Sequence, residues 1–238
     1  MRLAFISDIH GNAVALEAVL EDIRNKKIDK IFVLGDLCFR GPEPKKCLEL
    51  VQRLDSKIIK GNADEWIIRG IKKGEVVDSA FEIMSMEREW TLSKLDKVDV
   101  EFLTNLPVEL NLSYETVKIH AFHATPSSLF DIVKPTDPDE NIIEKMILDD
   151  ADIIIYGHIH KPYVRFINGS CVLNVGSVGL PFDGVAKSSY AIIDLQGNSI
   201  NTSIVRVNYD VDKVVQQFID SDYPNLKQMA TILKNGSV

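Results

Sequence analysis

The chain has 238 residues, of which 45% are hydrophobic and 26% are charged. This ordinary composition excludes a disordered, collagen-like or coiled-coil protein, and the length allows a large core without disulfide bonds. The formal net charge of −8 argues against a nucleic-acid coat protein or a protein of membrane surfaces. It also means that an anionic ligand is repelled unless a local feature reverses the sign of the charge.

Signals for targeting are few. The first apolar stretch ends at Asp8, too early for the core of a signal peptide, and the longest apolar runs are far shorter than a membrane span. The three cysteines, Cys38, Cys47 and Cys171, show no CxxC spacing. We therefore expect reduced thiols in a cytoplasmic protein.

The first sixty residues alternate short apolar strands with amphipathic helices. Strands are predicted at 3–6, 31–34 and 57–60, and helices over 12–27 and from Pro42 onward, where proline takes a favoured first helical position. This alternation predicts parallel strands joined by right-handed crossovers. In such sheets, ligands bind beyond the carboxyl ends of the strands.

Residues 63–106 interrupt this alternation. The segment is charged, carries Trp66, Met84 and Trp90, and is mostly helical by pattern. Aromatic and methionine stripes at helical spacing usually belong to a core, so we expect a helical layer packed on the sheet. The alternative is a partial cap over a site.

Strand patterns dominate the second half of the chain. Hairpins are predicted around 113–115, at Asn168-Gly169 and around 197–198. A helix capped near Asp137 is predicted within 135–150, and residues 210–238 contain one or two amphipathic helices. Because no internal repeat or linker is found, we expect an α/β fold with one domain over 1–238, two sheets and outer helices.

Residues of metal-ligating types follow five of the predicted strands. They are Asp8, His10, Asp36, Asn62, His123, His158 and His160. Asp8 and His10 are two residues apart, so on an extended chain both side chains point the same way, and a carboxylate beside an imidazole suits a divalent metal. Each pair alone is a weak signal, but five strand ends together predict a metal centre. His120 alternates against His123 and is expected to face away from it.

The order of these motifs, D-x-H, G-D, G-N, H and G-H-x-H, resembles that of the calcineurin-like metallophosphoesterases over nearly the whole chain. Residues 8–12 and 35–42 are similar to the first two motifs of that family. Residues 90–91, 102–107 and 176–181 resemble its bacterial and archaeal phosphodiesterase branch. The resemblance implies a four-layer α/β/β/α sandwich, with two mixed sheets flanked by helices and a dinuclear metal site at the carboxyl ends of the strands.

The resemblance also implies how the ions are held. One ion would bind Asp8, His10 and His160, the second would bind Asn62, His123 and His158, and Asp36 would bridge them. Oxygen and imidazole ligands fit Mn, Fe, Zn or Ni, and the resemblance favours manganese. A hydroxide bridging the two ions would attack phosphorus in line.

Three further residues have expected roles at the phosphate. Asn62 is expected to donate to a phosphate oxygen, and Arg40 either clamps another oxygen or is a solvated turn residue. Many family members carry a histidine after Gly-Asn that protonates the leaving group, whereas this chain has Ala63. Asp64 is either a substitute acid or the cap of the next helix, and we expect the cap. The missing histidine favours substrates with a good leaving group.

These residues predict a metal-dependent phosphoesterase, specifically a phosphodiesterase acting on a small phosphoester or nucleotide. Residues 35–41 also resemble the GDxxxRG pattern of diadenosine tetraphosphatases and protein phosphatases, so a dinucleoside polyphosphate hydrolase or a phosphomonoesterase is the alternative. A third hypothesis is a protein-binding scaffold of the same fold, but the intact set of metal-ligating residues argues against it. A homo-oligomer is left open. Two divalent ions would make the site locally positive although the chain carries −8.

Overall fold

The computed structural model describes residues 1–114, 116–148, 150–197 and 199–237. Within these residues, two β-sheets form the centre of the molecule. The first sheet contains β1 (Arg2–Ile6), β2 (Lys30–Val33), β3 (Ser56–Ile58), β9 (Ser188–Gln196) and β10 (Ser199–Val207). The second contains β4 (Glu109–Tyr114), β5 (Val117–Phe122), β6 (Ile153–Tyr156), β7 (Tyr163–Ile167) and β8 (Ser170–Asn174). The strand orders are β10-β9-β1-β2-β3 and β4-β5-β6-β8-β7.

Both sheets are mixed. Strands β1, β2 and β3 are parallel, as the alternation of strands and helices predicts, and β9 and β10 extend the sheet in the antiparallel sense. In the second sheet β5, β6 and β8 are parallel, and β4 and β7 are antiparallel edges. Ile6 pairs with Val33 and Val33 with Ile58, so the carboxyl ends of β1, β2 and β3 lie at one edge.

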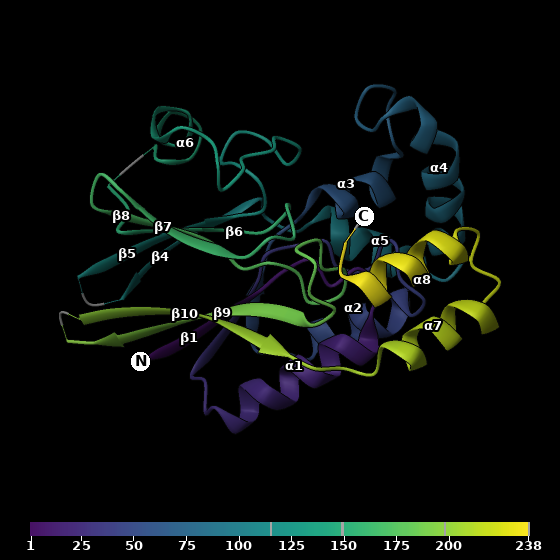
Figure 1. Ribbon diagram of the computed structural model, residues 1–238, viewed down its shortest axis with the longest axis horizontal. Helices are drawn as coiled ribbons and strands as arrows, with labels where there is room; N and C mark the ends of the chain where they lie inside the picture. The colour runs from purple at the N-terminus through teal and green to yellow at the C-terminus, as the bar shows by residue number, and fades with distance from the viewer. Residues whose placement is uncertain (115, 149, 198, 238) are drawn as a thin grey trace.

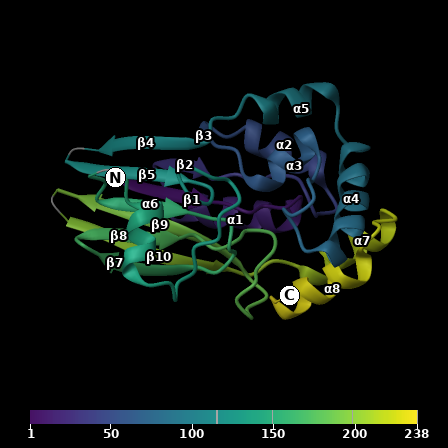
Figure 2. The ribbon, with the colours of Figure 1, turned by 90° about the horizontal axis from the view of Figure 1, so that it is seen from above.

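Helices cover the outer face of each sheet and the end of the sandwich. They are α1 (Ala13–Asn25), α2 (Pro44–Gln52), α3 (Asn62–Arg69), α4 (Asp78–Leu92), α5 (Lys97–Thr104), α6 (Asp139–Met146), α7 (Val211–Asp220) and α8 (Leu226–Asn235). Figure 1 shows α1 on the outer side of the first sheet and α6 on the outer side of the second. In Figure 2, α3, α4, α5, α7 and α8 gather at one end of the molecule. The expected α/β fold of two mixed sheets flanked by helices is confirmed.

Alternating side chains of β1 build two of the hydrophobic cores. Leu3 and Phe5 pack between the two sheets, whereas Ala4 and Ile6 face the helices on the outer side. The Phe5 ring stacks on that of Phe32, with centroids 4.8 Å apart. Because both faces are buried from Leu3 onward, residues 3–6 are all apolar, and each large side chain among them contributes about 1.5–3 kcal/mol of burial free energy.

Two predicted helix starts are wrong. The second helix begins at Pro44 and not at Pro42, because the preceding loop is held against the first loop: Glu43 N donates to Gly11 O at 2.9 Å. The helix within 135–150 begins at Asp139 with Pro138 at its N-cap. Asp137 instead closes the turn before the helix, where its carboxylate accepts from the backbone N–H of Lys134 at 3.0 Å.

Other local predictions are confirmed. Asn12 caps α1 by accepting from Ala15 N at 3.0 Å, and the Asn168-Gly169 turn has positive φ at both residues, as a tight hairpin requires. The predicted hairpin turns around 113–115 and 197–198 include Glu115 and Asn198, which lie outside the described residues, as does Val238 at the end of the chain. No helix in the described part of the chain combines the length and apolarity that crossing a bilayer requires.

Candidate metal centre

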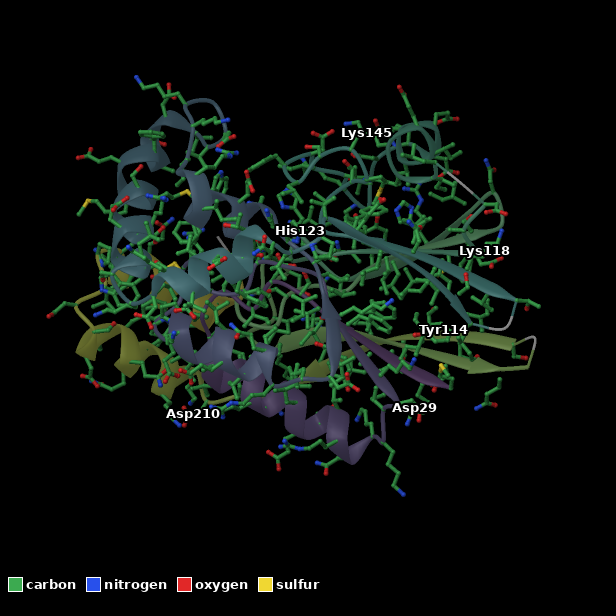
Figure 3. The ribbon with its side chains drawn as sticks, turned by 180° about the vertical axis from the view of Figure 1, so that it is seen from behind. Asp29, Tyr114, Lys118, His123, Lys145 and Asp210 are labelled. Carbon is green, nitrogen blue, oxygen red and sulfur yellow. The ribbon has the colours of Figure 1, made fainter. Side chains whose placement is uncertain are left out.

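Loops at the ends of the parallel strands bring the predicted ligands together. The ligand cluster, as we call it, comprises Asp8, His10, Asp36, Asn62, His123, His158 and His160. Single ligand atoms of Asp8, His10, Asp36 and His160 all lie within 4.8 Å of one another, and the four residues are buried. Figure 3 labels His123, which follows β5 directly and lies where the sheets meet the helices.

Asp36 connects the two halves of the ligand cluster. Its Oδ2 atom lies 3.6 Å from His10 Nε2 and 3.4 Å from His123 Nε2. On the second side, Asn62 Oδ1 lies 2.9 Å from His123 Nε2 and 2.8 Å from His158 Nδ1. The structure therefore places all seven predicted ligands in two groups that share one carboxylate oxygen.

Left-handed backbone conformations direct these side chains inward. Positive φ angles occur at Asp8 (55°), His10 (48°), Asp36 (55°), His158 (67°) and His160 (56°). The prediction that Asp8 and His10 share a direction because the chain is extended is wrong, since β1 ends at Ile6 and the chain turns at both residues. Such conformations cost on the order of 1–3 kcal/mol each and persist only where the surroundings impose them.

Glycines let the ligand loops approach one another. A Cβ atom on Gly157 would lie 2.2 Å from Ser7 Oγ and 2.5 Å from Asp8 Oδ2. A Cβ atom on Gly61 would lie 2.1 Å from Asp36 Oδ1. Because real Cβ contacts are never so short, only glycine allows these loops to hold the carboxylates in place.

Backbone carbonyls fix the orientation of three imidazole rings. His10 Nδ1 donates to Phe39 O at 2.8 Å, His123 Nδ1 donates to Leu34 O at 2.7 Å, and His160 Nδ1 donates to Leu180 O. Since a carbonyl only accepts, each Nδ1 carries a hydrogen, and in its neutral form each ring presents the lone pair of Nε2 to the ligand cluster.

The donor set fits a cation. The Nε2 atoms of His10 and His160 face each other at 3.1 Å, and with both Nδ1 atoms protonated neither neutral ring has a hydrogen to donate there. Asp8 Oδ1 is buried 3.0 Å from His160 Nε2, and the neutral His160 ring, with its hydrogen on Nδ1, has none to donate to it. Acceptors that converge without donors are satisfied by a shared positive charge, and carboxylate, amide and imidazole atoms are ligands of divalent transition metals.

Protonation equilibria in the ligand cluster follow burial and neighbouring charge. Burial and the nearby His160 lower the pKa of His10 to about 4, and burial and His123 lower the pKa of His158 to about 4. Against the effect of burial, the Asp36 carboxylate raises the pKa of His123 to about 9. Burial raises the pKa of Asp8, but His160, His123 and His10 together hold the pKa of that carboxyl below its usual range. Neutral rings at His10 and His158 are the form that binds a metal.

Arg40 lies beside the ligand cluster. Its side chain is only 16% exposed, and its Nε atom lies 3.2 Å from Oε2 of the fully buried Glu87 on α4. Its guanidinium also lies 3.5 Å from Met229 Sδ on α8. The reading of Arg40 as a solvated turn residue is therefore wrong. Nothing in the sequence pattern pointed to Glu87, which is 47 positions further along the chain in a charged helical segment.

Asp64 faces the backbone of its neighbours. Its carboxylate accepts from Asp36 N at 2.8 Å, Leu37 N at 2.9 Å and Gly61 N at 2.9 Å, and the residue is fully buried. Burial and the Asp36 carboxylate raise the pKa of Asp64 to about 7. Of the two readings, these contacts favour the cap, because both oxygens are used to hold the loop of Asp36 on the start of α3.

A cavity of about 150 Å³ opens over the ligand cluster. The floor of the cavity is formed by His10, Asp36, Asn62, His158 and His160. The side chains around it, which we call the cavity wall, are Phe39, Arg40, Trp66, Met84, Leu180 and Phe182. Trp66 and Met84 come from the 63–106 segment and also belong to the core beneath the first sheet. That segment thus both packs on the sheet and overhangs the site. His120 is not among these residues; its Nε2 lies 2.8 Å from Glu109 Oε2.

Two mixed sheets packed face to face, with a buried cluster of aspartate, histidine and asparagine at their carboxyl ends, are the architecture of metal-dependent phosphoesterases. Residues 1–198 match the profile of the calcineurin-like phosphoesterase superfamily domain, and the chain belongs to that superfamily.

Relatives and solved structures agree with this assignment. The chain is 32% identical over 239 residues to an uncharacterized protein of Methanocaldococcus jannaschii, with 93% of each chain covered. It is 25% identical over 204 residues to the phosphodiesterase YfcE of Escherichia coli, covering 82% of this chain and 88% of the relative. A metallophosphoesterase from Sphaerobacter thermophilus superposes with a TM-score of 0.79 at 27% identity over 99% of both chains. The resemblance drawn from the sequence motifs is confirmed.

Proposed function

We propose that this protein is a phosphodiesterase that uses two divalent metal ions, manganese in its active form. The observation that carries the proposal is the position of Asp36 Oδ2, 3.6 Å from His10 Nε2 and 3.4 Å from His123 Nε2, at the junction of two ligand groups. Asp8, His10 and His160 would hold one ion, Asn62, His123 and His158 the other, and Asp36 both. When bound, such ions supply Lewis acidity, which lowers the pKa of water and neutralises charge on the phosphate.

The chain's own residues would orient the substrate. The planar guanidinium of Arg40, held by Glu87, lines the cavity and suits two phosphoryl oxygens. The Oδ1 atom of Asn62 faces two imidazoles, which leaves its Nδ2 to donate to a third oxygen. Ala63 has no proton to give and Asp64 is turned away. The leaving group must therefore depart as a stable anion, which favours esters of acidic alcohols.

The proposed location is the cytoplasm. All three cysteines are buried and unpaired, and burial raises the pKa of Cys38 and Cys47 above the ordinary value of a thiol. Stable reduced thiols are usual in a reducing compartment.

The test is a hydrolysis panel with the purified protein stripped of metal and then loaded with Mn²⁺, Fe²⁺, Zn²⁺ or Ni²⁺. We expect bis-p-nitrophenyl phosphate to be cleaved about tenfold or more faster than p-nitrophenyl phosphate, and chelated protein to be inactive. A higher kcat/KM for diadenosine tetraphosphate would replace the diesterase with the polyphosphate hydrolase. A protein that binds two ions and cleaves none of these compounds would be a scaffold.

A further inference from the structure

A second cavity of about 420 Å³ adjoins the cavity over the ligand cluster. This side cavity, as we call it, is lined by Ile132, Lys134, Pro135, Thr136, His158, Ile159, Lys161 and Phe182. His158 and Phe182 line both cavities, so a molecule bound at the ligand cluster can extend directly into the side cavity. Its volume lies in the range of small-molecule sites.

The side cavity combines an apolar wall with two lysines. Ile132 is 58% exposed and gives this cavity an apolar surface that a ligand can cover. Phe182 stacks on the His160 ring at a centroid distance of 4.2 Å, which fixes its orientation beside the ligand cluster. A planar ring fits between such apolar groups, because aromatic faces stack.

Lys134 and Lys161 are the charged side chains that line this cavity, since the His158 ring beside them is neutral. Neither ammonium makes an ion pair with any described residue, and no described residue that lines the cavity is acidic. Two lysines in one cavity whose described lining has no acidic side chain make this lining positive in a chain of net charge −8. Lysine ammonium groups at such a place bind phosphate.

Hydrogen bonds fix the backbone of the loop that carries Lys134. Tyr156 donates its hydroxyl hydrogen to Val133 O at 2.9 Å, and Arg165 donates to Pro135 O at 3.0 Å. Lys134 N donates to the Asp137 carboxylate at 3.0 Å. The contacts from Tyr156 on β6 and Arg165 on β7, with the turn closed by Asp137, fix the backbone of this loop, which reduces the entropy lost when a ligand binds.

We propose that the side cavity binds the retained organic group of the diester, and that this group is a nucleotide. Its base would pack against Phe182 and Ile159, and a phosphate separate from the scissile one would lie between Lys134 and Lys161. The inference rests on the proposed function and narrows its substrate class. It predicts that, among esters with the same leaving group, a second phosphate on the nucleoside distinguishes good substrates from poor ones.

The experiment compares two substrates with the same leaving group. Thymidine 5′-(p-nitrophenyl phosphate) and its 3′-phosphorylated form both release p-nitrophenol, so their difference reports on binding of the second phosphate alone. We expect kcat/KM to be about tenfold higher for the 3′-phosphorylated form, mainly through a lower KM. The double variant Lys134→Ala/Lys161→Ala should abolish that preference and leave bis-p-nitrophenyl phosphate hydrolysis unchanged. Lys145→Ala, on α6 and apart from His123 in Figure 3, is the matched control.

Binding separates this inference from the proposed function. Calorimetry with thymidine 3′,5′-bisphosphate and thymidine 5′-phosphate should show about tenfold tighter binding of the bisphosphate, lost in the double lysine variant. If the protein hydrolyses nothing but shows this lysine-dependent binding, the inference stands and the enzyme proposal fails. If it hydrolyses diesters with equal kcat/KM for both thymidine substrates, or the lysine variant keeps the preference, the inference is overturned while the enzyme proposal stands.

Discussion

The ligand cluster sits on loops whose backbones touch, whereas the cavity wall above it is assembled from elements that are distant in sequence. Gly157 and Gly61 bring the ligand loops within van der Waals contact, and carbonyl oxygens orient the imidazoles. The cavity wall instead takes Trp66 from α3, Met84 from α4 and Phe182 from a loop before β9. In such a site, local backbone contacts fix the positions of the ligand cluster, and long-range packing sets the shape of the cavity that selects the substrate.

The largest expected effect comes from Asp36, the proposed shared ligand. In Asp36→Asn, a neutral amide replaces the carboxylate whose Oδ2 lies between His10 and His123. We expect the protein to retain at most one ion and to lose at least about a thousandfold in diester turnover. Metal content by atomic emission after dialysis, with turnover on the same samples, checks both. Glu144→Gln, on the exposed side of α6, is the control. Two retained ions with normal turnover would remove Asp36 from the shared position.

A glycine substitution tests whether backbone contact, and not ligand identity alone, makes the cluster. In Gly157→Ala the added Cβ meets Ser7 Oγ and Asp8 Oδ2. We expect about 10–100-fold weaker metal binding and a loss of about 1–3 kcal/mol in the free energy of unfolding. Gly169→Ala is the control, since no atom lies within 4 Å of the new Cβ and the only strain comes from its φ of +88°. It should cost about 1 kcal/mol and leave metal affinity unchanged. Equal metal affinity in both variants would contradict the contact argument.

The contrast also explains what the sequence could predict. Each ligand lies within a few residues of a strand end, and the edge of a parallel sheet gathers such positions, so Asp8, His10, Asp36 and Asn62 were predictable from local pattern. The left-handed conformations of Asp8, His10 and Asp36 were not, because an Asp-Ile-His tripeptide extends equally well in other contexts. The α2 start was misplaced because Pro42 and Pro44 carry the same local signal and only the loop contact at Glu43 decides between them.

The cavity wall was harder to predict because its contacts are long-range. Arg40 was recognised beside a motif, but its partners are Glu87 on α4 and Met229, 189 positions away on α8. No spacing rule connects such residues. The same holds for Lys134 and Lys161, which only the paths of two loops bring to one cavity.

Glu87→Gln tests whether the cavity wall positions Arg40. Glu87 is fully buried, and its second oxygen accepts from Asn225 Nδ2 at 2.9 Å, so glutamine keeps the shape and removes the charge. We expect kcat/KM for the diester to fall about tenfold, through KM more than kcat, with metal content unchanged. Glu89→Gln, 70% exposed two residues further along α4, should have no effect on kcat/KM. If Glu87→Gln lowers only thermal stability, Glu87 is structural and does not position Arg40.

The smallest effect on turnover is expected at Glu75, whose carboxylate accepts a hydrogen bond from Trp66 of the cavity wall. Its carboxylate accepts from Arg69 Nη2 at 2.6 Å and from Trp66 Nε1 at 3.0 Å, and chiefly the Arg69 contact lowers the pKa of Glu75 to about 2 from 4.5. A lowered folded-state pKa stabilises the protein above pH 4.5, and that contribution is lost as the pH falls toward 2. Glu75→Gln should therefore unfold with about 1 kcal/mol less free energy near neutral pH, change turnover less than about twofold, and approach the parent protein in stability under acid. Urea unfolding across this pH range measures the difference. If the difference in the free energy of unfolding were the same at every pH, Glu75 would act through its shape and not its charge. A large loss of turnover would show that the cavity wall is as tightly coupled to the chemistry as the ligand cluster.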